Sequence, residues 1–197
     1  MTTTTLPSPR PVVLGALAWL LAAIAVGATG FVAGLRPPGA QIIIFVLTSA
    51  AIFASVRIDS VRRAVDAIPL RGLVAIHVLR FVGIAFLILG SRGLMSSLFA
   101  ERAGWGDVIT AAGALLLATI GLGGSALKRQ LFMAWNVFGT IDLFLAVGTA
   151  TLVTLRGDAP GMQLIVQLPL ILVPIFAVPV LFASHVALFR RVGELRR

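Results

Sequence analysis

The feature that most constrains this chain is a series of long segments almost free of charge. An uncharged run from Pro11 to Leu35 follows Arg10, and it is longer than the roughly 7–15 residues of a signal-peptide core. A helix that crosses a bilayer needs roughly 20 apolar residues. Charged positions bound six such segments, at about 12–35, 39–56, 70–91, 106–126, 130–154 and 161–189. We therefore expect six membrane spans.

The spans are expected to be helices, because a backbone in hydrocarbon must satisfy its own hydrogen bonds. A transmembrane barrel would need alternating strands of about ten residues, which these runs are not. The sequence is 59% hydrophobic and only 12% charged, and its mean hydropathy is +1.06, which excludes a soluble fold. The predicted fold class is all-α: one polytopic bundle of six transmembrane helices over residues 1–197.

The net charge of +9, from 16 Lys and Arg against 7 Asp and Glu, would suggest a nucleic-acid partner in a soluble protein. Here the cations sort by loop into eleven on one side of the membrane and four on the other. The eleven are Arg10, Arg57, Arg62, Arg63, Arg71, Lys128, Arg129, Arg190, Arg191, Arg196 and Arg197, and the four are Arg36, Arg92, Arg102 and Arg156. The positive-inside rule then predicts cytoplasmic N and C termini in a bacterial inner membrane, with the lipid bilayer and not nucleic acid as partner.

Two connecting or packing features refine this topology. Apolar residues recur at helical spacing over about 58–68, which predicts an amphipathic helix on the cytoplasmic surface, ended by Pro69. Small residues line one face of the fourth span and one face of the fifth, which predicts that these two spans pack as an antiparallel pair. Three prolines in the sixth span, Pro169, Pro174 and Pro179, predict a kinked or broken helix that either lines a cavity or is purely structural.

Arg80 in the third span and Asp142 in the fifth are the clearest charges within the membrane. Each lies about 15–18 Å deep at 1.5 Å per residue, and each alone would cost on the order of 2.5–3.5 kcal/mol. We expect them to pair, as a structural staple or as part of a solute or ion site. Asp107 is a further polar candidate, but it opens the fourth span near the outer surface.

His77 shares a helix face with Arg80, and His185 lies at similar depth near the cytoplasmic end of the sixth span. Two imidazoles on different helices could hold haem b or another metal, or could simply pack without a cofactor. Asn136, at the start of the fifth span, is a neighbouring polar candidate. No cofactor is predicted beyond the haem alternative.

Enzyme motifs are present only in part, and the sequence favours a non-enzymatic protein without excluding an enzyme. Gly104-Trp-Gly-Asp107 matches the G-x-G-D motif of intramembrane aspartyl proteases. In those enzymes this aspartate comes second in chain order, whereas here Asp107 precedes Asp142 and is expected at the outer edge of the membrane. Gly123-Gly-Ser125-Ala with His185 resembles rhomboid proteases, but Ser125 ends its span instead of opening it. The single lysine, Lys128, lies in a loop, which excludes a retinal Schiff base within a span.

Taken together, four strings resemble a widespread group of small bacterial six-helix membrane proteins with no assigned activity. They are Arg80-Phe-Val-Gly83, Gly104-Trp-Gly-Asp107, Ala134-Trp-Asn136 with Gly139 and Asp142, and Leu168-Pro-Leu-Ile-Leu-Val-Pro174 with Pro179 and His185. The resemblance covers about residues 70–190 and implies no chemistry. Six helices and Ala18-x-x-x-Ala22 are also similar to the substrate-binding subunits of energy-coupling-factor transporters, although such spacing is common in membrane helices.

The leading hypothesis is a binding or transport protein for a small polar or anionic solute, with Arg80, Asp142, Asn136 and His77 as its site. In this hypothesis Arg80 meets an anionic group of the solute. A bis-histidine electron carrier that uses His77 and His185, and a structural or assembly subunit with a membrane partner, are the alternatives.

Overall fold

The computed structural model describes residues 8–122, 125–157 and 160–196. Within these ranges the chain is all-α, and six helices are long and apolar enough to cross a membrane. They are Arg10–Thr29, Gly39–Arg57, Leu70–Ser91, Ser97–Ile120, Ala126–Arg156 and Val173–Leu195. The predicted fold class is therefore confirmed. Gly123 and Gly124, at the end of the predicted fourth span, and Arg197, one of the predicted cytoplasmic cations, lie outside the described ranges.

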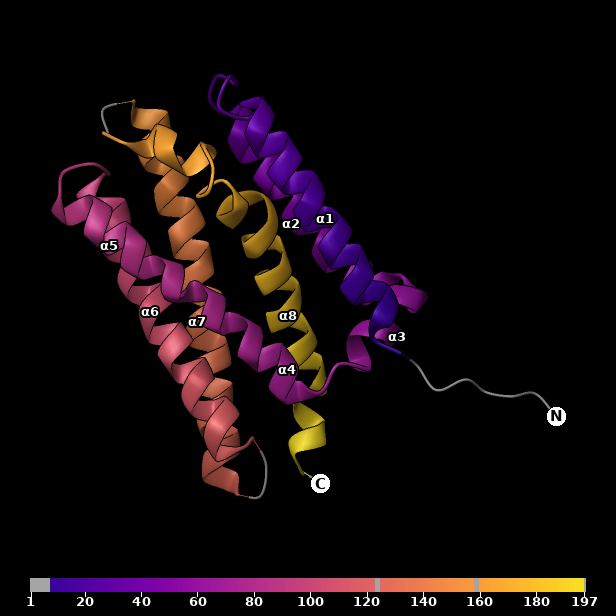
Figure 1. Ribbon diagram of the computed structural model, residues 1–197. Coiled ribbons are helices and arrows are strands. Elements are labelled where there is room, and N and C mark those ends of the chain that lie inside the picture. Colours follow the sequence, from indigo (N-terminus) through magenta and orange to yellow (C-terminus); the bar gives the residue numbers. More distant parts are fainter. Residues whose placement is uncertain (1–7, 123–124, 158–159, 197) are drawn as a thin grey trace.

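The helices form two groups with α8 (Val178–Arg191) between them (Figure 1). On one side lie α1 (Arg10–Thr29) and α2 (Gly39–Arg57), and α2 packs along α8. On the other side α6 (Ser97–Ile120) packs between α5 (Gly83–Ser91) and α7 (Ala126–Arg156). The packing of α6 on α7 is the span pair that the small residues predict.

The third span combines three helical geometries. It begins as α4 (Leu70–Ala75), tightens into the 3₁₀ segment η1 (Ile76–Val82) and continues as α5. The sixth span also changes geometry, because the π-helical segment η3 (Val173–Ala177) leads into α8 and the 3₁₀ segment η4 (Val192–Arg196) follows. Such departures within a helix often mark functional positions.

Both described chain ends lie at the same end of the bundle, together with the short helix α3 (Asp59–Asp66) (Figure 1). Arginines join the segments there. Arg190 donates to Ser55 O and pairs with Asp66 at 2.6 Å, while Arg191 donates to Ile68 O at 2.6 Å. This arrangement agrees with an even number of spans, while the assignment of that end to the cytoplasm stays a prediction.

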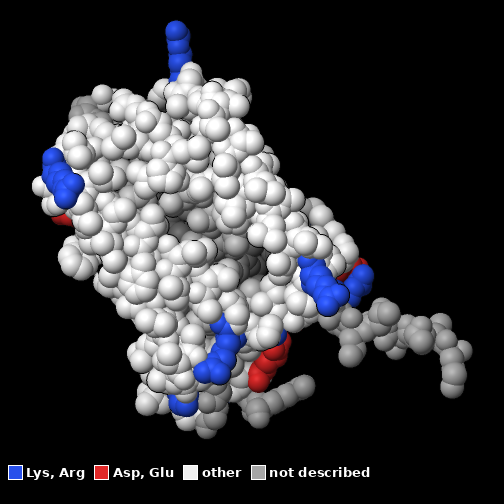
Figure 2. All heavy atoms as spheres, in the orientation of Figure 1, with Lys and Arg blue, Asp and Glu red and all other residues white. Residues whose placement is uncertain are grey.

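Large apolar side chains cover the outside of the helices, with Leu14 65% and Phe45 72% exposed. Figure 2 shows the centre of one face without Lys, Arg, Asp or Glu, and it shows that this centre is hollowed. So many large apolar side chains on the outside of the helices indicate a surface that faces lipid. The chain is a multi-span membrane protein in contact with the bilayer.

The largest differences from the expected bounds are in the first, fourth and sixth spans. The first span ends at Thr29, because Gly30 adopts the left-handed φ of +68° that closes a helix. The fourth spans Ser97–Ile120 instead of 106–126, because Glu101 and Arg102 are exposed on the helix surface and do not end it. The sixth long helix begins at Val173 instead of 161, after the separate 3₁₀ turn η2 (Met162–Val166).

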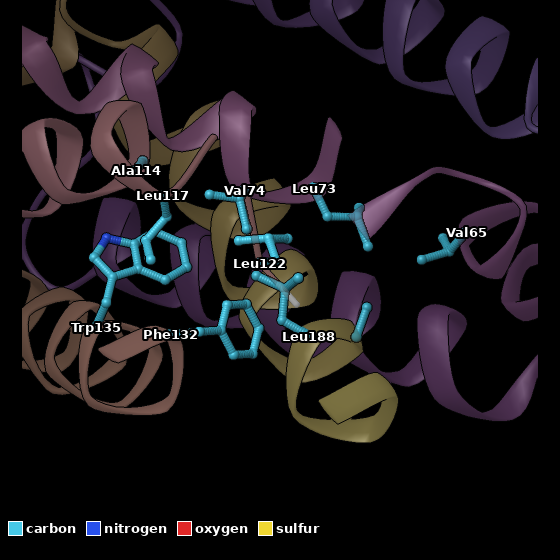
Figure 3. Close-up of a cluster of buried hydrophobic side chains, with 10 residues drawn as sticks. Val65, Leu73, Val74, Ala114, Leu117, Leu122, Phe132, Trp135 and Leu188 are labelled. Atoms are coloured by element: carbon cyan, nitrogen blue, oxygen red, sulfur yellow. The ribbon is translucent and has the colours of Figure 1, made fainter. Parts of the chain in front are cut away.

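A cluster of buried apolar side chains closes the bundle at the end that holds α3 (Figure 3). We call it the apolar plug; its buried members are Val65, Leu73, Val74, Ala114, Leu117, Leu122, Phe132, Trp135, Ala187 and Leu188. They come from α3, α4, α6, α7 and α8 and from the turn after α6, and Phe132, Leu188 and Val74 are fully buried. The plug therefore ties five helices together beneath the polar residues described next.

Candidate functional site

Arg80 is 1% exposed and joins three spans through its guanidinium group. Its Nε donates to Asp107 Oδ1 at 2.6 Å, its Nη2 donates to Asp142 Oδ2, and its Nη1 donates to Gly139 O at 3.0 Å. We call Arg80, Asp107 and Asp142 the charged triad. The structure thus pairs Arg80 with Asp142, as the matching depths predict, and adds a second carboxylate.

Asp107 was expected near the outer surface, and the structure corrects this position. Because α6 begins at Ser97, Asp107 lies ten residues into the helix, about 15 Å along its axis at 1.5 Å per residue. Ser96 caps that helix, since its Oγ accepts from Phe99 N at 3.5 Å. The expected position was wrong because Glu101 and Arg102 lie on the exposed surface of α6 and do not mark the start of the span.

Two glycines allow α7 to lie close to α6 and to α8. A Cβ on Gly106 would overlap the Asp142 carboxylate, so only a glycine leaves space for that side chain beside α6. A Cβ on Gly139 would lie 2.8 Å from His185 Cε1 and 2.9 Å from Thr110 Cγ2. These glycines are the sequence signal for the close approach, which the spacing of small residues suggested only in general terms.

His77 and His185 lie in contact with each other between the charged triad and the apolar plug, and both are completely buried. Their ring centroids lie 4.2 Å apart, and His77 Nε2 is 3.3 Å from Ser184 Oγ. His185 Nδ1 is 2.7 Å from Asn136 Oδ1, and Asn136 Nδ2 donates to His185 O at 3.3 Å. His77 Nδ1 and His185 Nε2 have no hydrogen-bond partner within the part of the chain that the structure describes.

This geometry does not suit a bis-histidine haem. Axial ligands lie on opposite faces of the macrocycle, whereas the rings of His77 and His185 are in direct contact and Trp135 packs edge-on against His77 at 5.1 Å. Among the described residues, no group of three or more His, Cys, Asp or Glu side chains could hold a metal ion. The two histidines are brought together as predicted, but as a packed pair.

The protease motifs do not assemble either. Asp107 and Asp142 are both bound to the Arg80 guanidinium, so they do not form a carboxylate dyad that faces a substrate. Ser125 is exposed and caps α7, where its Oγ accepts from Lys128 N at 3.2 Å, while the His185 ring is buried against Asn136. Serine and histidine therefore lack the contact that nucleophile activation requires.

A cavity of about 400 Å³ lies on the other side of the triad, and Arg80 and Asp107 are part of its wall. Its lining includes Val32 and Pro37 from the α1–α2 connection and Gln163 from η2, so it extends to the end of the bundle opposite the plug. Most of the wall is apolar. Along α7, Phe132 and Trp135 therefore belong to the apolar plug, and Asn136 contacts His185. Asp142 belongs to the charged triad, and the residues that follow it line the cavity.

Sequence reasoning missed two features of this wall. Gln41 lines the cavity, and its Oε1 is buried without a hydrogen-bond partner among the described residues. Phe86 and Phe99 also line it, with ring centroids 5.3 Å apart. A glutamine near the start of a span and two phenylalanines in apolar segments carry no distinctive pattern, so only the packing reveals them.

Residues 37–192 match a family described as a domain of unknown function, DUF8737. The chain belongs to this family. The match covers every residue of the triad and the histidine pair, and the family description assigns them no activity. No curated protein and no solved structure matched the chain.

Proposed function

We propose that this DUF8737 protein binds, and in the membrane transports, a small solute that has an apolar body and a polar group. The solute occupies the cavity, and its polar group faces the Arg80 and Asp107 side chains at the base. The carrying observation is that a cavity of about 400 Å³ ends on a buried charged triad. Ligand cavities commonly have volumes of about 300–1,000 Å³, with apolar walls and a few placed polar groups.

The architecture around the cavity supports binding from one side of the membrane. The cavity reaches the end of the bundle that holds the α1–α2 connection and η2, and the apolar plug closes the opposite end. With the termini in the cytoplasm, as the cation distribution predicts, the cavity faces outward. Kinked segments beside such sites are common in transporters, and η3 contributes Val173 and Pro174 to the wall.

The expectation that Arg80 meets an anionic solute is not supported by this geometry. Arg80 already donates to two carboxylates and to Gly139 O, and an anion at the base would also face Asp107. Like charges at such short range in a poorly solvated site repel each other strongly. Asn136 and His77 do not line the cavity, so in this proposal they do not contact the solute.

Thermal unfolding of the purified protein in detergent tests the proposal. The panel consists of solutes that share a benzyl group and differ in the head: benzyl alcohol, benzyltrimethylammonium and phenylmethanesulfonate. We expect saturable stabilisation by at least one of them. Flux of that solute into proteoliposomes then separates transport from binding.

Two alanines of α7 provide matched variants. Ala146 lines the cavity and Ala134 is exposed on the outside of the bundle, so Ala146→Phe fills the cavity and Ala134→Phe does not. Stabilisation lost in Ala146→Phe and kept in Ala134→Phe supports the proposal. If no member of the panel stabilises the protein, or if Ala146→Phe leaves the stabilisation intact, the proposed function is wrong.

A structural or assembly subunit is the second candidate, because the triad also serves to join η1, α6 and α7. In that case the protein co-purifies with a stable membrane partner. The triple variant Arg80→Met, Asp107→Val, Asp142→Val, which removes all three charges together, would then leave the complex intact. Loss of solute stabilisation in the same variant would instead favour the binding function.

A further inference from the structure

The charges of the triad do not sum to zero when both aspartates are ionised. Arg80 contributes +1 and the ionised carboxylates of Asp107 and Asp142 contribute −2, which leaves −1. Among the described residues, Arg80 is the salt-bridge partner of both aspartates and no second cation pairs with either. An uncompensated charge away from water costs several kcal/mol, so the triad needs one further positive charge, from a proton or from a cation.

The geometry of the guanidinium brings the two carboxylates together. Nε and Nη2 form one edge of the planar group, and Asp107 accepts from the first while Asp142 accepts from the second. Two carboxylates on one guanidinium repel each other, which favours a proton on one of them. The other titratable groups packed nearby are His77 and His185, which are engaged with Ser184 and Asn136 and not with the carboxylates.

The cavity wall offers a second way to supply the charge. Asp107 lines the cavity, Phe86 and Phe99 form part of its wall, and Gln41 Oε1 is an acceptor without a partner among the described residues. An excess negative charge, aromatic rings and a carbonyl oxygen all interact favourably with a positive group. Each of the three guanidinium nitrogens of Arg80 already donates one hydrogen bond, two to the carboxylates and one to Gly139 O.

We propose that the solute is a monovalent organic cation, an ammonium group on a small apolar body, and that it displaces a proton from the Asp107–Asp142 pair. The ammonium group lies beside Asp107 and the apolar body lies among the aliphatic and aromatic side chains of the wall. The displaced proton leaves to water. This inference rests on the proposed function and names the solute class of that same site.

Three probes with the same benzyl body test the charge preference: benzyltrimethylammonium, its uncharged carbon isostere neopentylbenzene, and phenylmethanesulfonate. We expect the cation to bind about tenfold or more tightly than the isostere, and the sulfonate to bind least. Cation affinity should rise with pH, because the proton competes for the same charge. In unbuffered solution a pH indicator should report proton release when the cation binds.

Asp107→Asn leaves Arg80 paired with Asp142 alone, which is a balanced pair and should fold. We expect about a tenfold or greater loss of cation affinity, no proton release, and little change for the neutral isostere. If that variant does not fold, Asp142→Asn achieves the same charge balance from a residue outside the cavity wall and should likewise abolish proton release. Ala134→Phe is the control and should bind all three probes as the parent protein does.

The outcomes separate this inference from the proposed function. Equal binding of cation and isostere, tighter binding of the sulfonate, or cation binding without proton release overturns the cation proposal and leaves the cavity function standing. If none of the probes binds, both fail. An unchanged cation affinity in folded Asp107→Asn also overturns the cation proposal, because the excess charge would then play no part in recognition.

Discussion

Asp107 and Asp142 accept hydrogen bonds from the same edge of one buried guanidinium group, although they belong to different membrane spans. Arg80 is the charge partner of each aspartate, and the two carboxylates compensate the buried charge of Arg80. The stability of three spans is therefore coupled through one side chain. This coupling leads to measurable effects outside the binding experiments.

Arg80→Met should destabilise the protein strongly, by about 3–5 kcal/mol, because it leaves two buried carboxylates without a partner. The triple variant Arg80→Met, Asp107→Val, Asp142→Val removes the charges together and should recover most of that loss. Unfolding in detergent micelles, followed by far-UV circular dichroism, measures both. A triple variant no more stable than the single one would show that the triad is not the source of the loss.

Gly106→Ala should cost about 1–3 kcal/mol, because the added Cβ overlaps the Asp142 carboxylate and pushes α7 away from α6. Gly148→Ala on α7 is the control, since its Cβ would meet no atom within 4 Å. The control should be neutral or more stable by up to about 1 kcal/mol, as expected for alanine in a helix. Equal effects of the two substitutions in thermal unfolding would contradict the close approach.

Asn136→Ala should destabilise the protein by about 1–3 kcal/mol, because it leaves His185 Nδ1 buried without a partner. A double-mutant cycle with His185→Phe isolates the contact, and we expect a coupling free energy of about 0.5–3 kcal/mol. Denaturant titration of the four proteins supplies the values. Additive effects would mean that the two side chains contribute independently.

The sequence contains no cysteine, so single cysteines can report access to the cavity without any background. Ala150 lines the cavity, whereas Ala187 is fully buried in the apolar plug. In purified protein, Ala150→Cys should react with the trimethylammonium-ethyl methanethiosulfonate reagent and Ala187→Cys should not. Mass spectrometry measures the modification. Reaction at position 187 at the same rate would show that the plug does not close that end.

Applied to sealed vesicles of known orientation, the same reagent tests the topology. Because the cavity opens at the end opposite the termini, Ala150→Cys should be modified from the extracytoplasmic side. Modification only from the cytoplasmic side would reverse the orientation that the cation distribution predicts.

Much of the architecture follows from the sequence pattern alone. Span number and helical class follow from the length and apolarity of the uncharged runs, because hydrocarbon imposes the same requirement on every segment that crosses it. The depth of Arg80 and Asp142 along their spans already indicates that they pair. The predicted depth of Asp107 was wrong, because a charged residue on the surface of a helix, such as Glu101, resembles in sequence a residue at a helix boundary.

The histidines show the opposite limit. Matching depth brings His77 and His185 to the same level, but a haem pair and a packed pair have the same spacing in sequence. The distance between their rings, 4.2 Å, depends on how closely α8 approaches η1 and α7, and Gly139 and Ser184 control that approach through packing.

The sequence by itself therefore determined a six-span helical membrane protein with charges at matched depths, because solvation by lipid acts on each segment separately. Only the tertiary structure decided that Arg80 serves two carboxylates, that a cavity ends on this triad and that the histidines pack ring against ring. Those features arise where residues from different helices share one volume. Their charges and contacts add up only after the helices have packed.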